Sequence, residues 1–231
     1  MWPLIKKDIK VHLKSPVFAV VASLFLFLTG FAFTAQMTQA LPQHLPEASL
    51  RGTLYFMAVI LLFISPFLTM RSIAEERRSG TIELLKTLPL SDLKLVLGKF
   101  LAVWILHALL LILTLEFPLL LILIGEPEGG TMLLSYLGLL LLGGAFLSVG
   151  LFCSSLTRNQ MVAAILTFVV LITLWFLSDS GGPIGETISV ITHLDSFGTG
   201  VFDLSDFLYY LLFIFGFLFL TVRWMEAERW K

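Results

Sequence analysis

The sequence is poor in charge. Only 13% of its 231 residues are Asp, Glu, Lys or Arg, whereas soluble globular domains carry about 25%. So few charged side chains cannot cover the surface of a soluble protein, which argues against a soluble enzyme and a disordered chain. The formal net charge is −1, so no basic excess points to nucleic-acid binding. The composition indicates an integral membrane protein.

Cysteine and the motifs of nucleotide and metal chemistry are also scarce. The single cysteine, Cys153, excludes an internal disulfide framework and a metal site built on a cysteine pair. The seven methionines are scattered, so soft ligands for copper are not clustered. A P-loop is missing, because Gly98-Lys99 is followed by Phe100 and Leu93 stands where the first glycine belongs. The chain is therefore predicted to be no enzyme, to hold no metal or cofactor, and to take any ATP-derived energy from a partner.

Long apolar stretches are what the sequence has instead. Apolar residues make up 58% of the chain, and the mean hydropathy is +0.95. About 20 apolar residues are enough for a helix to cross a bilayer, and the alternating pattern of outer-membrane strands is missing. The sequence predicts an all-α polytopic membrane protein, with one transmembrane domain over 1–231. Its six predicted spans are 17–36, 53–70, 100–124, 131–156, 160–178 and 207–222.

The positive residues lie almost entirely on one side of the predicted membrane. Of the 15 Lys and Arg residues, all but Arg51 fall in the two terminal tails and in the second and fourth connections. By the positive-inside rule, both termini are cytoplasmic and the chain is a multi-pass protein of a bacterial or archaeal inner membrane. The opposite face is acidic. Either acids are simply what remains there once the positive residues are kept inside, or they form a vestibule that attracts cations. Its acids are Glu47, Glu126, Glu128, Asp179, Glu186, Asp195, Asp203 and Asp206.

The N-terminal stretch 2–14 is predicted to form an amphipathic helix. Its lysines lie mostly off an apolar stripe with helical spacing, formed by Trp2, Ile5, Ile9 and Leu13. Such a helix suits the headgroup layer of the inner leaflet, the alternative being an ordinary solvated tail. Ser15-Pro16 ends the helix and turns the chain into the first span.

The second connection, residues 71–99, carries a short amphipathic helix. Gly80 interrupts the charged extension of span two, and Pro89 stops the helix that follows. The helix over 80–88 has a leucine-rich face with acidic and basic residues on its N-terminal side. It either docks into the cleft of a partner or lies flat on the bilayer. Ser91 or Asp92 can cap the next helix, which runs into span three.

Two further features stand out in the spans and on the acidic face. Glu116 lies within span three before Pro118, and a charged residue there is by default a candidate functional site. The alternative is a structural role, in which Glu116 is protonated or hydrogen-bonded to the helix beside a proline kink, or lies near the outer interface. His107 is predicted to be a hydrogen-bonded interior residue. The connection 184–203 is too apolar for a free loop and too short for a span, so we expect helices that pack on the outer end of the bundle.

The second connection resembles that of ABC-2 type transporter permeases. The resemblance rests on Glu-Glu-Arg-Arg-Ser-Gly-Thr-Ile-Glu-Leu-Leu within 70–99, on the Leu-Pro-Leu-Ser turn and on the Leu-Gly-Lys ending. More narrowly, the chain is similar to the permeases of gliding-motility transporters and of nitrous-oxide-reductase copper maturation. The segment from His193 to Phe197 and the residues Gly200 to Asp203 resemble the outer segment of that group, and the resemblance covers nearly the whole chain.

The resemblance implies partners and site residues. Two such permeases would pair, as a homodimer or with a related chain, above two ABC ATPase subunits that bind ATP and Mg. The helix over 80–88 would be the coupling helix. The residues that couple to the ATPase would be Glu75, Glu76, Arg78, Gly80, Thr81, Glu83, Leu84 and Leu85. The extracellular segment would use His193, Asp195, Asp203 and Asp206.

These observations predict the membrane subunit of an ABC transporter complex. It would couple ATP hydrolysis by partner subunits to export or to conformational signalling across the inner membrane. One alternative is a mechanotransmitting scaffold that passes force to a periplasmic or extracellular partner without carrying cargo. The other is a secondary transporter, which would need ion-coupling residues in the membrane and usually two similar halves; Glu116 is the candidate for that role.

Overall fold

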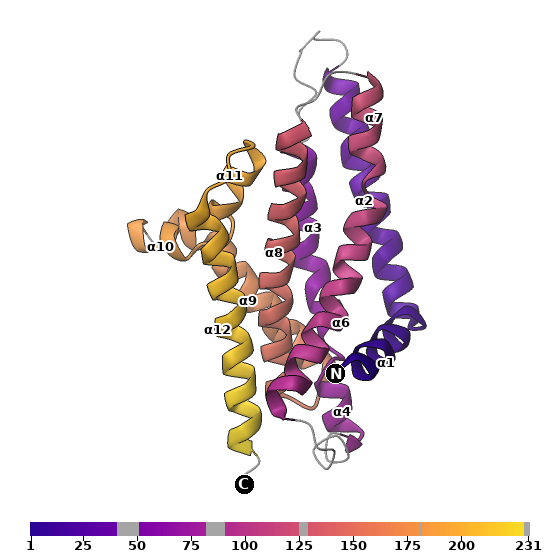
Figure 1. Ribbon diagram of the computed structural model, residues 1–231, viewed down its shortest axis with the longest axis vertical. Coiled ribbons are helices and arrows are strands. Elements are labelled where there is room, and N and C mark those ends of the chain that lie inside the picture. Colours follow the sequence, from indigo (N-terminus) through magenta and orange to yellow (C-terminus); the bar gives the residue numbers. More distant parts are fainter. Residues whose placement is uncertain (41–50, 82–90, 125–128, 181, 229–231) are drawn as a thin grey trace.

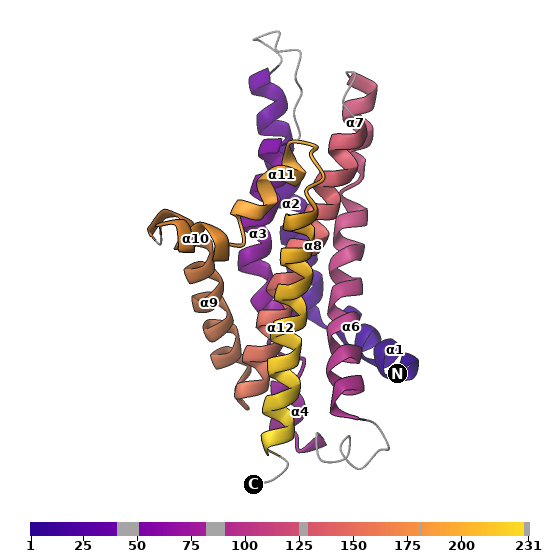
Figure 2. The ribbon, with the colours of Figure 1, turned by 60° about the vertical axis from the view of Figure 1, so that its left-hand side comes forward.

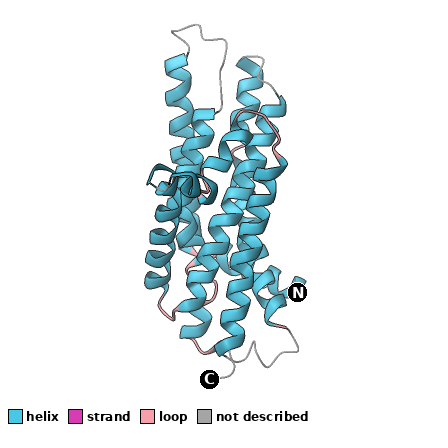
Figure 3. Ribbon diagram, turned by 90° about the vertical axis from the view of Figure 1, so that its left-hand side faces the viewer, coloured by secondary structure: helices cyan, strands magenta, loops and turns pink. Residues whose placement is uncertain are grey.

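The computed structural model describes residues 1–40, 51–81, 91–124, 129–180 and 182–228, and in these ranges the regular elements are helices. The long helices are α2 (Pro16–Ala40), α3 (Arg51–Thr69), α6 (Asp92–Leu113), α8 (Gly129–Leu156), α9 (Gln160–Ser180) and α12 (Leu204–Glu228). The shorter ones are α1 (Trp2–Leu13), α4 (Ala74–Arg78), α7 (Glu116–Ile124), α10 (Gly182–Ile188), the 3-10 turn η2 (Thr192–Leu194) and α11 (Asp195–Gly198). The all-α prediction is confirmed (Figure 3).

Six helical segments in the described residues are long and apolar enough to cross a membrane. They are Pro16–Thr38, Gly52–Arg78, Asp92–Leu123, Gly129–Leu156, Gln160–Leu177 and Leu204–Glu228. Each contains most or all of one predicted span, so the six-span prediction is confirmed. The helices run side by side, and both chain ends lie at one end of the bundle (Figures 1 and 2). We call this the terminal end.

The helix α8 forms the centre of the bundle. Burial covers 83% of its most apolar window, against 72% for α3 and 22% for α9. Glycines along α8 let the neighbouring helices approach closely, as small residues do in membrane bundles. A Cβ atom at Gly143 would lie 2.1 Å from Nε2 of His107, and one at Gly150 would lie 2.1 Å from Oγ1 of Thr69. His107 is buried and its Nε2 lies 3.2 Å from the carbonyl of Leu139, which confirms it as an interior residue.

The third span bends between α6 and α7, within the stretch predicted as one run over 100–124. Pro118 has no N–H group, so the carbonyl of Thr114 lacks its usual helical donor. The hydroxyl of Tyr136 on α8 donates to this carbonyl at 2.8 Å. The bend places Glu116 at the first position of α7, where a carboxylate is favoured by the helix dipole.

The helix α1 is present as predicted, but its buried side differs from the predicted apolar stripe. It crosses the long axis of the bundle (Figure 1) and packs on α6. Its buried side chains are Leu4, Ile5 and Asp8. Trp2 and Leu13, which the stripe included, are 60% and 46% exposed. These two side chains therefore do not face the bundle, and the buried contact of α1 instead includes Asp8, which has a buried cationic partner on α6. The location of α1 in a headgroup layer stays a prediction.

Candidate functional site

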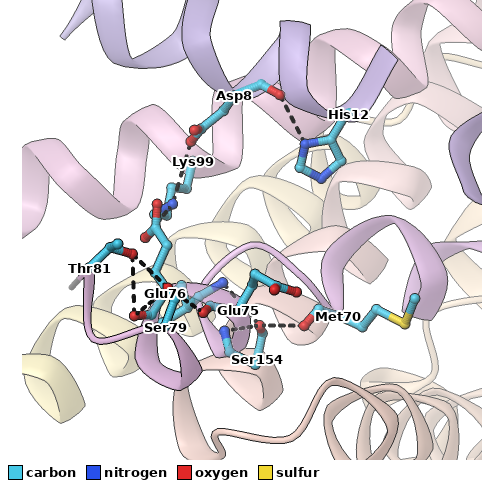
Figure 4. Close-up of polar contacts among 11 residues, drawn as sticks. Asp8, His12, Met70, Glu75, Glu76, Ser79, Thr81, Lys99 and Ser154 are labelled. Carbon is cyan, nitrogen blue, oxygen red and sulfur yellow. Dashed lines mark hydrogen bonds and ion pairs between the residues drawn. The ribbon is translucent and has the colours of Figure 1, made fainter. Parts of the chain in front are cut away.

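The helix of span two is broken just before its charged extension. α3 ends at Thr69, the chain turns, and α4 begins at Ala74. The hydroxyl of Ser154 on α8 accepts from the N–H groups of Ile73 and Ala74 at 3.2 and 3.1 Å. The same hydroxyl donates to the carbonyl of Met70 at 3.2 Å (Figure 4). One side chain of α8 therefore satisfies three backbone groups that the break releases.

Replacing Ser154 with alanine is expected to lower stability by about 2 kcal/mol, because buried N–H and C=O groups lose their partners. The matched control is Ser155→Ala, since the hydroxyl of Ser155 donates only to Phe152 of its own helix, at 2.7 Å. Thermal unfolding of the purified chain in detergent measures the difference. Equal melting temperatures for the two variants would show that the break does not depend on Ser154.

A buried cation joins α4 to two other helices. The ammonium of Lys99 on α6 lies 2.7 Å from Oε2 of Glu76 on α4 and 3.5 Å from Oδ2 of Asp8 on α1 (Figure 4). The side chain of Lys99 is only 3% exposed, and those of Asp8 and Glu76 are 11% and 13% exposed. Buried charges are tolerated only when they are paired. These three charges therefore depend on one another and hold α1, α4 and α6 together.

A second ion pair connects α4 to the C-terminal helix. The guanidinium of Arg77 contacts both carboxylate oxygens of Glu228 on α12, with Nη1 at 2.7 Å from Oε1. A bidentate pair of this kind fixes direction as well as distance. Although α4 is only five residues long, its side chains and backbone are thus bonded to α6, α8 and α12, and Lys99 of α6 connects it in turn to Asp8 of α1. We call Asp8, Glu76, Arg77, Lys99, Ser154 and Glu228 the α4 junction.

The residues predicted for coupling are divided by the structure. Glu76 belongs to the α4 junction, while Glu75, Arg78 and Thr81 are exposed on its outer side. Gly80 has a φ angle of +70° and nothing near the position of a Cβ atom, so its backbone angle, rather than space, requires glycine. The predicted helix over 80–88 lies outside the described residues from position 82 onward, and this part includes Glu83, Leu84 and Leu85.

Sequence reasoning missed most of the α4 junction. Lys99 was counted among the cations of a solvated connection, and Asp8, Ser154 and Glu228 were not singled out. Asp8 did carry a signal, because an acid four residues after Leu4 lies on the same helix face as that buried leucine. The other bonded partners are separated by between 23 residues, for Glu76 and Lys99, and 151 residues, for Arg77 and Glu228, and no local pattern links them.

The connection between α9 and α12 contains a second cluster of polar contacts, and this cluster brings two predicted residues together. Nδ1 of His193 lies 2.7 Å from Oδ1 of Asp206 at the start of α12. The hydroxyl of Ser196 donates to the other oxygen of Asp206. The ring of His193 stacks on Tyr209 with centroids 3.8 Å apart, and its Nε2 lies 3.1 Å from the carbonyl of Thr187. These contacts fasten the connection between α9 and α12 onto α12, with which η2 makes contact.

The other two predicted residues of this segment lie at helix starts. Asp203 accepts from the N–H of Ser205 at 2.8 Å and so caps α12, and Asp195 is exposed at the start of α11. Glu116 is exposed on the side of the bundle, and no ion pair connects it to another described residue. Among the described residues, no three His, Cys, Asp or Glu side chains are grouped so that they could hold a metal ion.

Comparison with known proteins identifies the family. The family model described as ABC-2 family transporter protein matches residues 29–194, which is more than two thirds of the chain. The chain belongs to this ABC-2 family. The ABC-2 permease is accordingly a membrane component of an ABC transporter rather than its nucleotide-binding subunit, and its family implies association with ABC ATPase subunits. No curated protein sequence matches the chain significantly. The α4 junction lies in the matched range except for Asp8 and Glu228.

Proposed function

We propose that this permease couples ATP hydrolysis by partner ATPase subunits to movement of its six-helix bundle, for export or for signalling across the inner membrane. The observation that carries the proposal is the α4 junction. The segment that leads into the predicted coupling helix is bonded by ion pairs to α6 and α12 and by Ser154 to α8. A displacement of that segment therefore reaches three helices directly, and it reaches α1 through the pair of Lys99 with Asp8.

The charge pattern supports the orientation in the proposal. The terminal end carries the lysines of α1 and the basic residues that flank Gly80, which the positive-inside rule assigns to the cytoplasm. We therefore place both termini and the predicted coupling helix on the cytoplasmic side, where ATPase subunits with bound ATP and Mg would meet Glu75, Arg78 and Thr81. A second permease, identical or related, would complete the complex.

The test is ATPase activity of the reconstituted complex, purified with the ATPase subunit encoded beside the permease. Leu85→Asp is expected to abolish stimulation of the ATPase by the permease, because a carboxylate cannot enter the apolar cleft that the leucine would fill. The control is Leu93→Asp, since Leu93 lies at the same end and is 53% exposed. Full stimulation with Leu85→Asp would contradict docking through the helix over 80–88.

A mechanotransmitting scaffold is the second candidate. It is favoured by the cluster of His193, Ser196 and Asp206, which binds the outer connection to α12 and offers a fixed surface to a periplasmic or extracellular partner. The narrower relation to gliding-motility or copper-maturation permeases belongs with this candidate. A secondary transporter has less support, because Glu116 faces outward and is ion-paired with no described residue, whereas ion coupling needs inward-facing groups.

A further inference from the structure

A cavity of about 610 Å³ opens at the terminal end beside the α4 junction. Its lining comes from α1, from the first turn of α2, from the end of α3 with the turn that follows, from α4, from Lys99 of α6 and from the first residue of α9. This is the size of a small-molecule site. The ion pairs of Lys99 involve only part of the lining, so the function proposed for the α4 junction leaves the rest of it unexplained.

The cavity lies at the level where the apolar part of three spans ends. The apolar run of the first span starts at Val17, that of the second ends at Met70, and the fifth span starts at Gln160. Polar side chains and the rings of Phe18 and Phe67 meet in the cavity wall. Phe67 is 47% exposed on the bundle surface next to the cavity. This combination is typical of the layer in which lipid phosphates lie.

The charged residues of the cavity differ in their partners. Asp8 and Glu76 pair with Lys99, and Glu75 is exposed. The guanidinium of Arg71, by contrast, donates from Nη1 to the hydroxyl of Ser15 at 2.9 Å and from Nε to the amide oxygen of Gln160 at 3.2 Å.

Both partners of Arg71 are neutral, and no carboxylate among the described residues forms an ion pair with it. Arg71 is half-buried, and its remaining N–H groups have no acceptor in the described part of the chain. The exposed side chains of Lys7 and Arg78 also line the cavity and add positive charge. A half-buried guanidinium held in place by two neutral groups is prepared for an anion with several acceptor oxygens.

We propose that this cavity binds a phosphate group through Arg71, with Ser15 and Gln160 fixing the guanidinium. The adjoining exposed ring of Phe67 and the half-buried Val17 give an acyl chain an apolar path away from the phosphate. An anionic phospholipid therefore satisfies both the polar and the apolar walls, whereas free phosphate satisfies only the first. A bound lipid phosphate would link α2, α3 and α9, which Arg71, Ser15 and Gln160 already join.

The experiment measures lipid binding to the full-length, delipidated protein by native mass spectrometry. Phosphatidylglycerol is added in detergent, with phosphatidylcholine, whose phosphate is balanced by its choline cation, as the zwitterionic reference and millimolar inorganic phosphate as a competitor. Arg71→Gln is expected to weaken phosphatidylglycerol binding by about tenfold or more, as loss of a charge-assisted contact does. The control is Arg223→Gln, which removes the same charge at the same end from a side chain that is 64% exposed and paired with Glu226.

Because Arg71 also joins Ser15 to Gln160, the melting temperature of each variant is measured in phosphatidylcholine. If Arg71→Gln does not fold, Arg71→Lys retains the charge and is expected to weaken binding several-fold through loss of the planar fork. Phosphatidylglycerol binding that resists inorganic phosphate identifies a lipid as the source. Equal competition by inorganic phosphate identifies free phosphate. Binding that is unchanged in both Arg71 variants, or lost equally in Arg223→Gln, would overturn the proposal.

Discussion

Replacement of Lys99 by alanine is expected to destabilise the bundle by about 3–5 kcal/mol, the cost of removing one partner from a buried ion pair. The carboxylates of Asp8 and Glu76, with side chains only 11% and 13% exposed, would be left without a cation. They would either stay charged in a poorly solvated place or separate α1 and α4 from α6 to reach water. Thermal unfolding in detergent and the yield of monodisperse protein measure the effect.

Two comparisons isolate the role of the charge. Lys94→Ala removes an exposed lysine one turn earlier on the same helix and is expected to change stability little. A triple variant with Lys99→Met, Glu76→Gln and Asp8→Asn removes all three charges, and it is expected to regain most of the stability lost in Lys99→Ala. If Lys99→Ala melts at the temperature of Lys94→Ala, the three charges do not hold the helices together. If the triple variant folds but no longer stimulates the ATPase, the junction transmits movement as well.

Gly143→Ala is the second substitution with a large expected effect, about 3 kcal/mol. The added Cβ atom would lie 2.1 Å from Nε2 and 2.5 Å from Cε1 of His107, far inside contact distance. The imidazole would have to leave the carbonyl of Leu139, which it meets at 3.2 Å. No open space surrounds the ring, because His107 is only 1% exposed. The melting temperature of the purified chain reports the loss.

The control for this substitution is Gly216→Ala on α12, where nothing lies within 4 Å of the added atom. Alanine there is expected to leave stability unchanged or to raise it slightly, since glycine is the poorer helix former. A double-mutant cycle identifies the cause: His107→Ala removes the ring that Gly143→Ala meets, so the double variant is expected to lose less than the sum of the single variants. Additive losses would show that the ring is not the obstacle.

The helical architecture was predictable because a bilayer imposes a minimum length on every span. Six apolar runs had to become helices, since backbone groups in hydrocarbon need internal partners, and the structure confirms them. The bend of the third span also follows from the local sequence, because Pro118 has no N–H group to donate to the carbonyl of Thr114 four residues earlier. The cap by Ser91 follows equally from local sequence, and its hydroxyl accepts from the N–H of Lys94.

The α4 junction could not be predicted in the same way. Lys99 borders an apolar span, and the sequence places it only among the positive residues of the second connection, because its two acids lie 91 and 23 positions away and on different helices. The break after Thr69 depends on Ser154 of α8. Nothing in the sequence around Ser154 distinguishes it from other serines in helices. Hydrophobic periodicity reports which side of a helix is apolar, and it does not report which charged residue will find a buried partner.

The sequestration of α8 also limits how two permeases can meet. In the most apolar stretch of α8, 83% of the residues are already buried within one chain, and in that of the second span 72% are, so these helices have little area left to share with a second chain. A partner permease must therefore contact the outer faces of α2, of α6 with α7, of α9 or of α12. In the most apolar stretches of these spans only 33%, 44%, 22% and 28% of the residues are buried. In a paired complex each α8 would remain inside its own protomer, so that rocking of one protomer against the other would carry the α4 junction with it as a unit.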